Sequence, residues 1–440
     1  RGLVAIRLSV NAPNNPGPLA GTGEQQPGGG AVDPRAVAVN PPEVSPGPQN
    51  GNSLPLPGGG DTPFEGLPDF TRPREPQPEP SAIARRPQRR SDAVVLASIS
   101  GDLQRQWEAQ RVRPAPAADD TEWCRRLFLR TLGRIPAPEE LESFLKLPAS
   151  ERRTALLEQL LGEPYADEFA RYWAGLLTNQ FIGNRGGEGS LANREGLIDY
   201  LRQALREGKP YDELTHGLLT ATGSPQPGSP RYNGATNFLL ALHDGENIQA
   251  TSRVAQVFLG RRLQCAECHD DPATELSQRR FWTFNASFRQ LHVERPRGGE
   301  GVLLTDRDFF GEGRTASPDE AELYYEEPGG EMRAAYPEFV DGTPLSRGGR
   351  VEEVNRRLEL AEQVTASADF SRAMVNRIWA HYLGYGFTRP IDDLGPHNPP
   401  SHPKLLDGLA EEFIARDFDL KQLIGLIAGS EASALSGQVG

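Results

Sequence analysis

Hydrophobic residues recur at helical spacing through most of the chain after residue 118. An apolar face from Trp123 to Leu132 marks the first expected helix, which Thr121 is placed to cap. A Pro-Ala-Pro-Glu-Glu run at 136–140 opens a second, because proline suits the first helical turn and acids suit the positive helix end. The same spacing predicts helices over 150–161, 165–178, 191–206, 211–220 and 247–263. Residues 118–292 are therefore expected to form an all-α domain.

The pattern changes between residues 293 and 350. This stretch is dense in Asp and Glu, and two short apolar runs, 302–304 and 323–325, have the length of strands. We expect an acidic, irregular connector with a small β element. Helical spacing returns over 351–435, where the longest apolar face runs from Phe370 to Tyr382. The predicted fold class is therefore mainly α, a multi-helix globular region with a small irregular or β insertion.

Residues 1–117 lack this regular spacing over most of their length. Glycine and proline recur there, as in the Pro-Gly-Gly-Gly runs at 27–30 and 57–60. Such a segment cannot bury enough apolar surface to offset the entropy lost on ordering, so we predict a long disordered linker. One stretch, roughly 91–112, has the pattern of a helix that would pack on the globular part.

Charge and hydropathy limit the classes of function. The formal net charge of −13 argues against nucleic-acid binding, which needs a basic surface. No apolar run of about 20 residues is present, so we expect a membrane contact only through an N-terminal anchor in a piece absent from this chain. The nucleotide-loop, serine-hydrolase and zinc-protease motifs are also missing from the sequence. No catalytic residue is assigned, and whether the protein is an enzyme stays open.

The most informative motif is Cys265-Ala266-Glu267-Cys268-His269, which reads C-x-x-C-H. Two thiols one helical turn apart can each form a thioether with a haem vinyl group. The histidine that follows then lies under the ring and can bind the iron through an imidazole nitrogen. Two of the chain's three cysteines are in this motif. We therefore expect haem c attached through Cys265 and Cys268, with His269 as the proximal ligand.

Two other interpretations of the motif remain open. Zinc could be held tetrahedrally by Cys265, Cys268 and His269, with Cys124 or Asp271 as the fourth ligand. Alternatively, the two motif cysteines could form a disulfide or remain thiols in a structural turn. An oxidising compartment would favour haem or a disulfide over a thiolate-zinc site.

A second axial haem ligand would come from a histidine more readily than from methionine, because the chain has only two methionines. The candidates, which sequence does not rank, are His292, His381 and His402. A haem with one protein ligand is also open. His397 and His402 lie in a proline-rich turn after paired aspartates, where a metal role competes with a simpler one. In the simpler interpretation Ser401 caps a helix that begins near Pro403.

Several short motifs resemble, in the same order, the planctomycete cytochrome-c-like domain. They are the Leu-Gly-Arg-Ile-Pro run at 132–136, the Tyr-Trp pair at 172–173, and Phe-Leu-Gly at 258–260 before the C-x-x-C-H motif. The Asn-Arg-Ile-Trp-Ala-His run at 376–381, Gly-Tyr-Gly at 384–386 and the 399–403 turn resemble the companion domain that usually follows. Together the two cover roughly residues 120–435. The resemblance implies extracytoplasmic proteins, periplasmic or at the cell surface, of unknown biochemical function.

One position departs from the family pattern. The family usually has His-Asp-His-Pro after the second cysteine, whereas this chain has His269-Asp270-Asp271-Pro272. If the second histidine binds a metal in relatives, this protein has lost that ligand or uses the carboxylate of Asp271 instead. Two functions are carried forward. One is haem-linked redox chemistry or electron transfer with a redox partner protein, and the other is a scaffold role in a surface assembly, with a structural metal site or disulfide.

Overall fold

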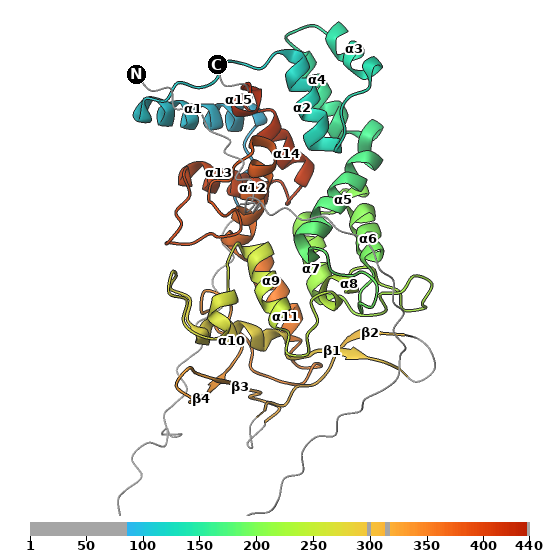
Figure 1. Ribbon diagram of the computed structural model, residues 1–440, viewed down its shortest axis with the longest axis vertical. Helices are drawn as coiled ribbons and strands as arrows, with labels where there is room; N and C mark the ends of the chain where they lie inside the picture. Colours follow the sequence, from blue (N-terminus) through green and yellow to red (C-terminus); the bar gives the residue numbers. More distant parts are fainter. Residues whose placement is uncertain (1–85, 297–300, 313–316, 438–440) are drawn as a thin grey trace, which may run out of the picture. The chain divides into compact units, whose positions relative to one another are not determined.

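The computed structural model describes residues 86–296, 301–312 and 317–437. Over these residues the chain forms fifteen α-helices and two small two-stranded sheets, which confirms the prediction of a mainly α fold (Figure 1). The disorder predicted for the N-terminal segment falls on residues 1–85, outside the described part. Among the described helices, none combines the length and the apolar character needed to cross a bilayer.

The first helix, α1 (Asp92–Gln110), lies within the segment that we assigned to the linker. Its buried residues Val95, Ile99 and Leu103 follow one helical face, and the helix packs against the C-terminal helices α14 (Leu420–Ala428) and α15 (Glu431–Ala434). This confirms the helix predicted near residues 91–112 and corrects the expectation of a linker up to residue 117, because the helix buries an apolar stripe despite its Pro/Gly-rich neighbours.

The helices predicted for the first domain are all present, with small differences in their ends. They are α2 (Asp120–Leu132), α3 (Pro138–Lys146), α4 (Arg152–Leu161), α5 (Ala166–Ile182), α6 (Arg194–Arg206), α7 (Tyr211–Thr220) and α9 (Ile248–Leu259). The short helix α8 (Thr236–Leu240), between α7 and α9, was not predicted. The predicted cap of α2 is wrong. Asp119 caps the helix by accepting a hydrogen bond from the Glu122 amide at 2.8 Å, which places Thr121 inside the first turn.

The connector contains the β structure. After α10 (Gln278–Asn285), strand β1 (Leu291–Glu294) pairs antiparallel with β2 (Leu303–Asp306), and β3 (Leu323–Glu326) pairs antiparallel with β4 (Met332–Ala335). Strands β2 and β3 confirm the two predicted apolar runs. The connector has only a small apolar cluster of its own, in which Leu323, Tyr325 and Ala335 pack with Ala286, while its Leu304, Phe339 and Val340 belong to the main core.

The C-terminal helices share one hydrophobic core with the first domain. They are α11 (Arg356–Ala366), α12 (Ala368–Leu383), α13 (Pro403–Ala415), α14 and α15. Helix α12 contacts α9, α13 and α14 (Figure 1). The main buried cluster extends without a break from α1 through α9 to α14, so the two domains of the sequence pack as one unit.

Two consecutive arginines at the start of α11 anchor the connector to this core. The buried Arg356 guanidinium donates to four backbone carbonyls, those of Ala286, Ala321, Arg347 and Gly348, at 2.7–3.1 Å. Burial lowers the pKa of Arg356 to about 10. Arg357 Nε lies 2.6 Å from Asp306 Oδ1, and the two side chains are only 1% and 8% exposed. Arg357 also donates to the Leu219 and Ala221 carbonyls at the C-terminal end of α7.

Removing the carboxylate from this buried pair should destabilise the protein strongly. In Asp306→Ala the Arg357 charge stays buried without its partner, so we expect the free energy of unfolding to fall by about 3–5 kcal/mol. Urea unfolding followed by circular dichroism measures the change. Arg372→Ala is the matched control, because it breaks an exposed pair with Asp407 and should cost less than about 1 kcal/mol. Equal midpoints for the two variants would show that the buried pair does not anchor the connector.

Candidate functional site

The C-x-x-C-H motif follows directly from the end of α9. Gly260 ends that helix with a φ of +62°, and a Cβ there would lie 2.8 Å from a methyl carbon of Leu394, so glycine is required on both counts. The chain then forms a short 3₁₀ turn, η2 (Gln264–Glu267). Leu263 and Ala266 are buried and hold this turn against the core. The side chains of Cys265, Cys268 and His269 are exposed to solvent.

The turn is supported through its backbone by α10. Trp282 Nε1 and Gln278 Nε2 both donate to the Glu267 carbonyl, at 3.1 and 3.2 Å. Gln278 also donates to the Glu326 carbonyl of β3 at 2.9 Å. The Trp282 ring stacks on Tyr325 with 5.9 Å between ring centroids. Helix α10 and strand β3 therefore support the motif from one side. These contacts do not use the side chains of Cys265, Cys268 or His269.

The tautomer of His269 can be assigned from its hydrogen bond. Its Nδ1 lies 2.7 Å from the Asp270 carbonyl oxygen. A carbonyl only accepts, so Nδ1 carries the proton and Nε2 is the basic nitrogen with a free lone pair. Histidine ligands of metals are commonly held in this way, with the second nitrogen donating to a carbonyl. His269 therefore presents Nε2 as the nitrogen that could act as a ligand.

The two aspartates after His269 shape the turn that leads into α10. Asp270 Oδ1 accepts a hydrogen bond from the backbone amide of Gln278, and Asp271 Oδ1 accepts one from the backbone amide of Ala273, each at 2.8 Å. Asp271, which stands at the family's second histidine position, thus uses its carboxylate in a local turn. This contact accounts for Asp271 without a metal.

The three cysteines differ in environment, and all are free thiols in the structure. Cys124 is 0% exposed on α2, and burial, with smaller contributions from the charges of Glu140 and Asp120, raises the pKa of its thiol to about 11. It therefore stays protonated at neutral pH. Within the described residues, no three His, Cys, Asp or Glu side chains are grouped so that they could hold a metal ion.

His381 lies toward the opposite end of α12 from the residue that contacts the segment leading into the motif. On α12 it is 12 residues beyond Asp369, or about 18 Å along the helix axis. Asp369 is the residue that pairs with Arg261, just before the motif, at 2.7 Å. His381 Nε2 lies 2.7 Å from the Arg130 carbonyl, and burial lowers the pKa of the ring. The ring packs on Trp173 with 5.0 Å between centroids.

His402 is part of the turn before α13. Its Nδ1 lies 3.0 Å from Ser401 Oγ, and its ring packs against Phe387. Burial lowers its pKa. The predicted cap by Ser401 is wrong, since His402 itself is the N-cap residue and makes no side-chain cap bond. The helix begins at Pro403, one residue too late for Ser401 to reach its first amides.

The loop that carries His397 lies against the segment leading into the motif. The Leu394 amide donates to the Gly260 carbonyl at 2.6 Å, and Arg262 pairs with Asp392 at 2.8 Å. His397 Nε2 lies 2.9 Å from Asp393 Oδ1. The companion domain thus reaches the motif through this loop rather than through His381.

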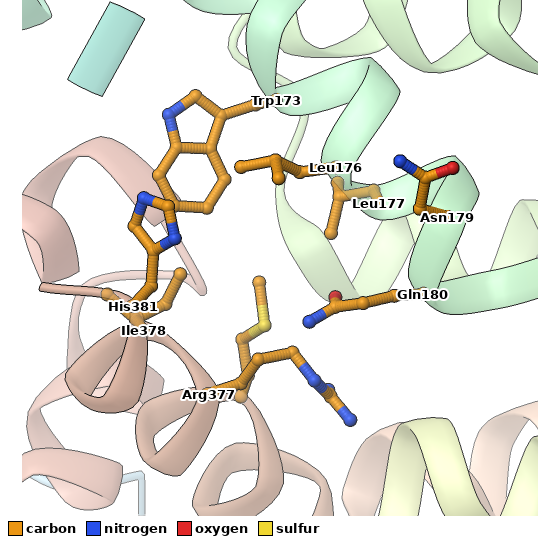
Figure 2. Close-up of a pocket in the computed structure, with 9 residues that line it drawn as sticks. Trp173, Leu176, Leu177, Asn179, Gln180, Arg377, Ile378 and His381 are labelled. Carbon is orange, nitrogen blue, oxygen red and sulfur yellow. The ribbon is translucent and has the colours of Figure 1, made fainter. Parts of the chain in front are cut away.

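A second feature, which we did not predict, is a cavity of about 250 Å³ between α5 and α12. Figure 2 shows Trp173, Leu176, Leu177 and Gln180 from α5 facing side chains of α12. The α12 residues are Met374, Arg377, Ile378 and His381. On each helix the lining residues repeat at helical spacing. The sequence signal that could have indicated the cavity is that Gln180 and Arg377 are polar residues on otherwise apolar helix faces.

Two family models match the chain. Residues 98–293 match PSCyt2, a protein of unknown function (DUF1549), and residues 356–439 match PSD1, a protein of unknown function (DUF1553). No curated protein and no solved structure matches. The first match begins within α1 and contains the C-x-x-C-H motif, and the second begins at the first residue of α11.

The difference in exposure predicts how the thiols react. In folded, reduced, haem-free protein, two thiols per chain should react rapidly with Ellman's reagent, because Cys265 and Cys268 are exposed. The third, Cys124, should react only after unfolding, since it is buried and protonated. Mass mapping of the labelled sites identifies the two groups. Rapid labelling of Cys124 in the folded state would contradict the assignment.

Proposed function

Because the chain belongs to the planctomycete proteins that join a cytochrome-c-like PSCyt2 domain to a PSD1 domain, we propose that it carries covalent haem c. Cys265 and Cys268 form the two thioethers, and His269 is the proximal iron ligand. The protein works in electron transfer or another redox reaction in an extracytoplasmic compartment. The observation that carries the proposal is the state of His269, whose Nδ1 proton is held by the Asp270 carbonyl so that Nε2 is free.

The residues of the motif fit the covalent attachment of haem. Both thiols are exposed and unpaired, so a maturation system can reach them. Glu267 is fixed by Trp282 and Gln278, which orients the turn between the two thiols. A bound haem supplies one-electron redox chemistry. The exposed setting favours exchange of electrons with a partner protein over chemistry in an enclosed substrate pocket.

The proposed location follows from the chemistry of the thiols. Two exposed cysteines three residues apart oxidise readily outside the cytoplasm, where disulfides persist. Thioether bonds to haem protect both sulfurs from that reaction. An extracytoplasmic site and haem attachment are therefore mutually consistent.

The test is to make the protein in a host that matures c-type cytochromes and to record a pyridine haemochrome spectrum. We expect a c-type α-band that survives acid-acetone extraction, with a mass increase of one haem per chain. Cys265→Ala with Cys268→Ala should abolish the covalent haem. His269→Ala should retain attached haem in part but change its spin state, because the proximal nitrogen is lost.

Cys124→Ala is the matched control, since it removes a thiol that lies outside the motif. Its haem content should equal that of the wild type. A colourless wild-type protein from a competent host would overturn the proposal. Metal analysis and thiol counting on the same sample would then separate a zinc site from a disulfide, the two arrangements that suit a scaffold.

A further inference from the structure

The cavity between α5 and α12 is bordered by polar groups where a helix interface normally buries apolar ones. Trp173, Leu176 and Leu177 form its apolar wall on α5. Arg377 and His381, one turn apart on α12, face that wall (Figure 2). The exposed Asn179, which accepts a hydrogen bond from Arg194, marks the side where the cavity meets solvent.

Arg377 is a buried cation without an ion-pair partner among the described residues; the charge of Asp392 acts on it, but less strongly than burial does. It is 6% exposed, and Nη1 donates to the Val257 carbonyl in the last turn of α9 at 2.9 Å. In the described part of the chain this is its one hydrogen bond, and no carboxylate pairs with it. Burial without a pair lowers its pKa. The guanidinium therefore keeps donors for an additional partner.

The other buried arginines show that this state is unusual here. Arg357 is paired with Asp306, and Arg416 with Glu412 and Asp92. Arg356 has no acid partner but donates four hydrogen bonds to carbonyls. Burying a cation is costly unless it is paired or fully hydrogen-bonded. Arg377 has neither arrangement, and it borders a cavity that an anion can enter.

The apolar part of the lining suits an organic rather than an inorganic anion. The Arg130 carbonyl holds the proton of His381 on Nε2, so Nδ1 is an acceptor, and it has no partner among the described residues. The Gln180 amide likewise makes no hydrogen bond within the described part. Most of the other lining side chains are apolar, which favours a ligand that carries an apolar body.

We propose that this cavity binds a small organic carboxylate, with its charged group at Arg377 and its apolar body between Trp173, Leu176 and Ile378. A cavity of about 150 Å³ holds benzene, so one of this size suits about ten non-hydrogen atoms. The site joins the two domains, since α5 lies in the PSCyt2 match and α12 in the PSD1 match. It does not depend on whether haem is attached.

The test is isothermal titration calorimetry on the full chain, with benzoate as the probe and benzyl alcohol as its uncharged counterpart. We expect benzoate to bind and benzyl alcohol to bind at least about tenfold more weakly, because a hydrogen-bonded charge is worth more than one factor of ten. Arg377→Met should weaken benzoate binding by about tenfold or more for the same reason. Arg171→Gln, which removes an exposed arginine on α5 outside the cavity, should leave binding unchanged.

Arg377 also contacts the end of α9, so a second variant guards against a folding defect. Leu176→Phe leaves the charge in place and fills part of the cavity, and it should also weaken benzoate binding. Circular dichroism verifies that each variant is folded. Absence of benzoate binding to the wild type in the millimolar range, equal binding of benzyl alcohol, or unchanged binding by both variants would each overturn the proposal. None of these outcomes bears on haem attachment, which is read from the spectrum.

Discussion

The buried arginines at the start of α11 fix a part of the chain that has little hydrophobic core of its own. Arg356 binds carbonyls from the middle and the C-terminal end of the connector and from η3 (Ala286–Phe288), and Arg357 joins β2 to the end of α7. A guanidinium taken out of water must find several partners, so its position is tightly specified once those carbonyls are in place. The connector is thus held by polar contacts that a loose arrangement could not satisfy.

This anchoring extends to the motif. Strand β3 belongs to the connector, and it carries Tyr325, which stacks on Trp282, and the Glu326 carbonyl, which Gln278 binds. Trp282 and Gln278 in turn hold Glu267 between the two cysteines. The support is made almost entirely through backbone groups of the turn. The side chains that would meet a prosthetic group are therefore oriented without being used in the fold.

Sequence periodicity predicted the helices well, because each buries a stripe that repeats every three to four residues. It failed at helix ends, where a single hydrogen bond decides the boundary. Asp119 rather than Thr121 caps α2, and His402 rather than Ser401 is the N-cap residue of α13. The helix near residues 91–112 was predicted from its spacing and is present as α1, but the linker was drawn past it to residue 117, because its burial depends on helices more than 300 residues away in the chain.

The two candidate sites also differ in how far the sequence alone predicts them. The motif is local in sequence, so five letters were enough to locate it, although the tautomer of His269 and the support from Trp282 depend on folded geometry. The cavity joins α5 to α12, whose residues are about two hundred positions apart. Gln180 and Arg377 can each be seen as irregular within a helical face, but nothing in either segment indicates that they face each other.

Gly260 of the first domain contacts Leu394 of the second, so the two domains depend on each other at the segment that leads into the motif. Leu394 of the second domain packs against Gly260, in the segment that leads to the two cysteines. We therefore expect that neither family domain folds independently of the other. Separating the two domains would remove the contact of Leu394 with the segment that leads into the turn of Cys265 and Cys268. Selection on the motif therefore acts on both halves together, which gives a physical reason for finding them on one polypeptide.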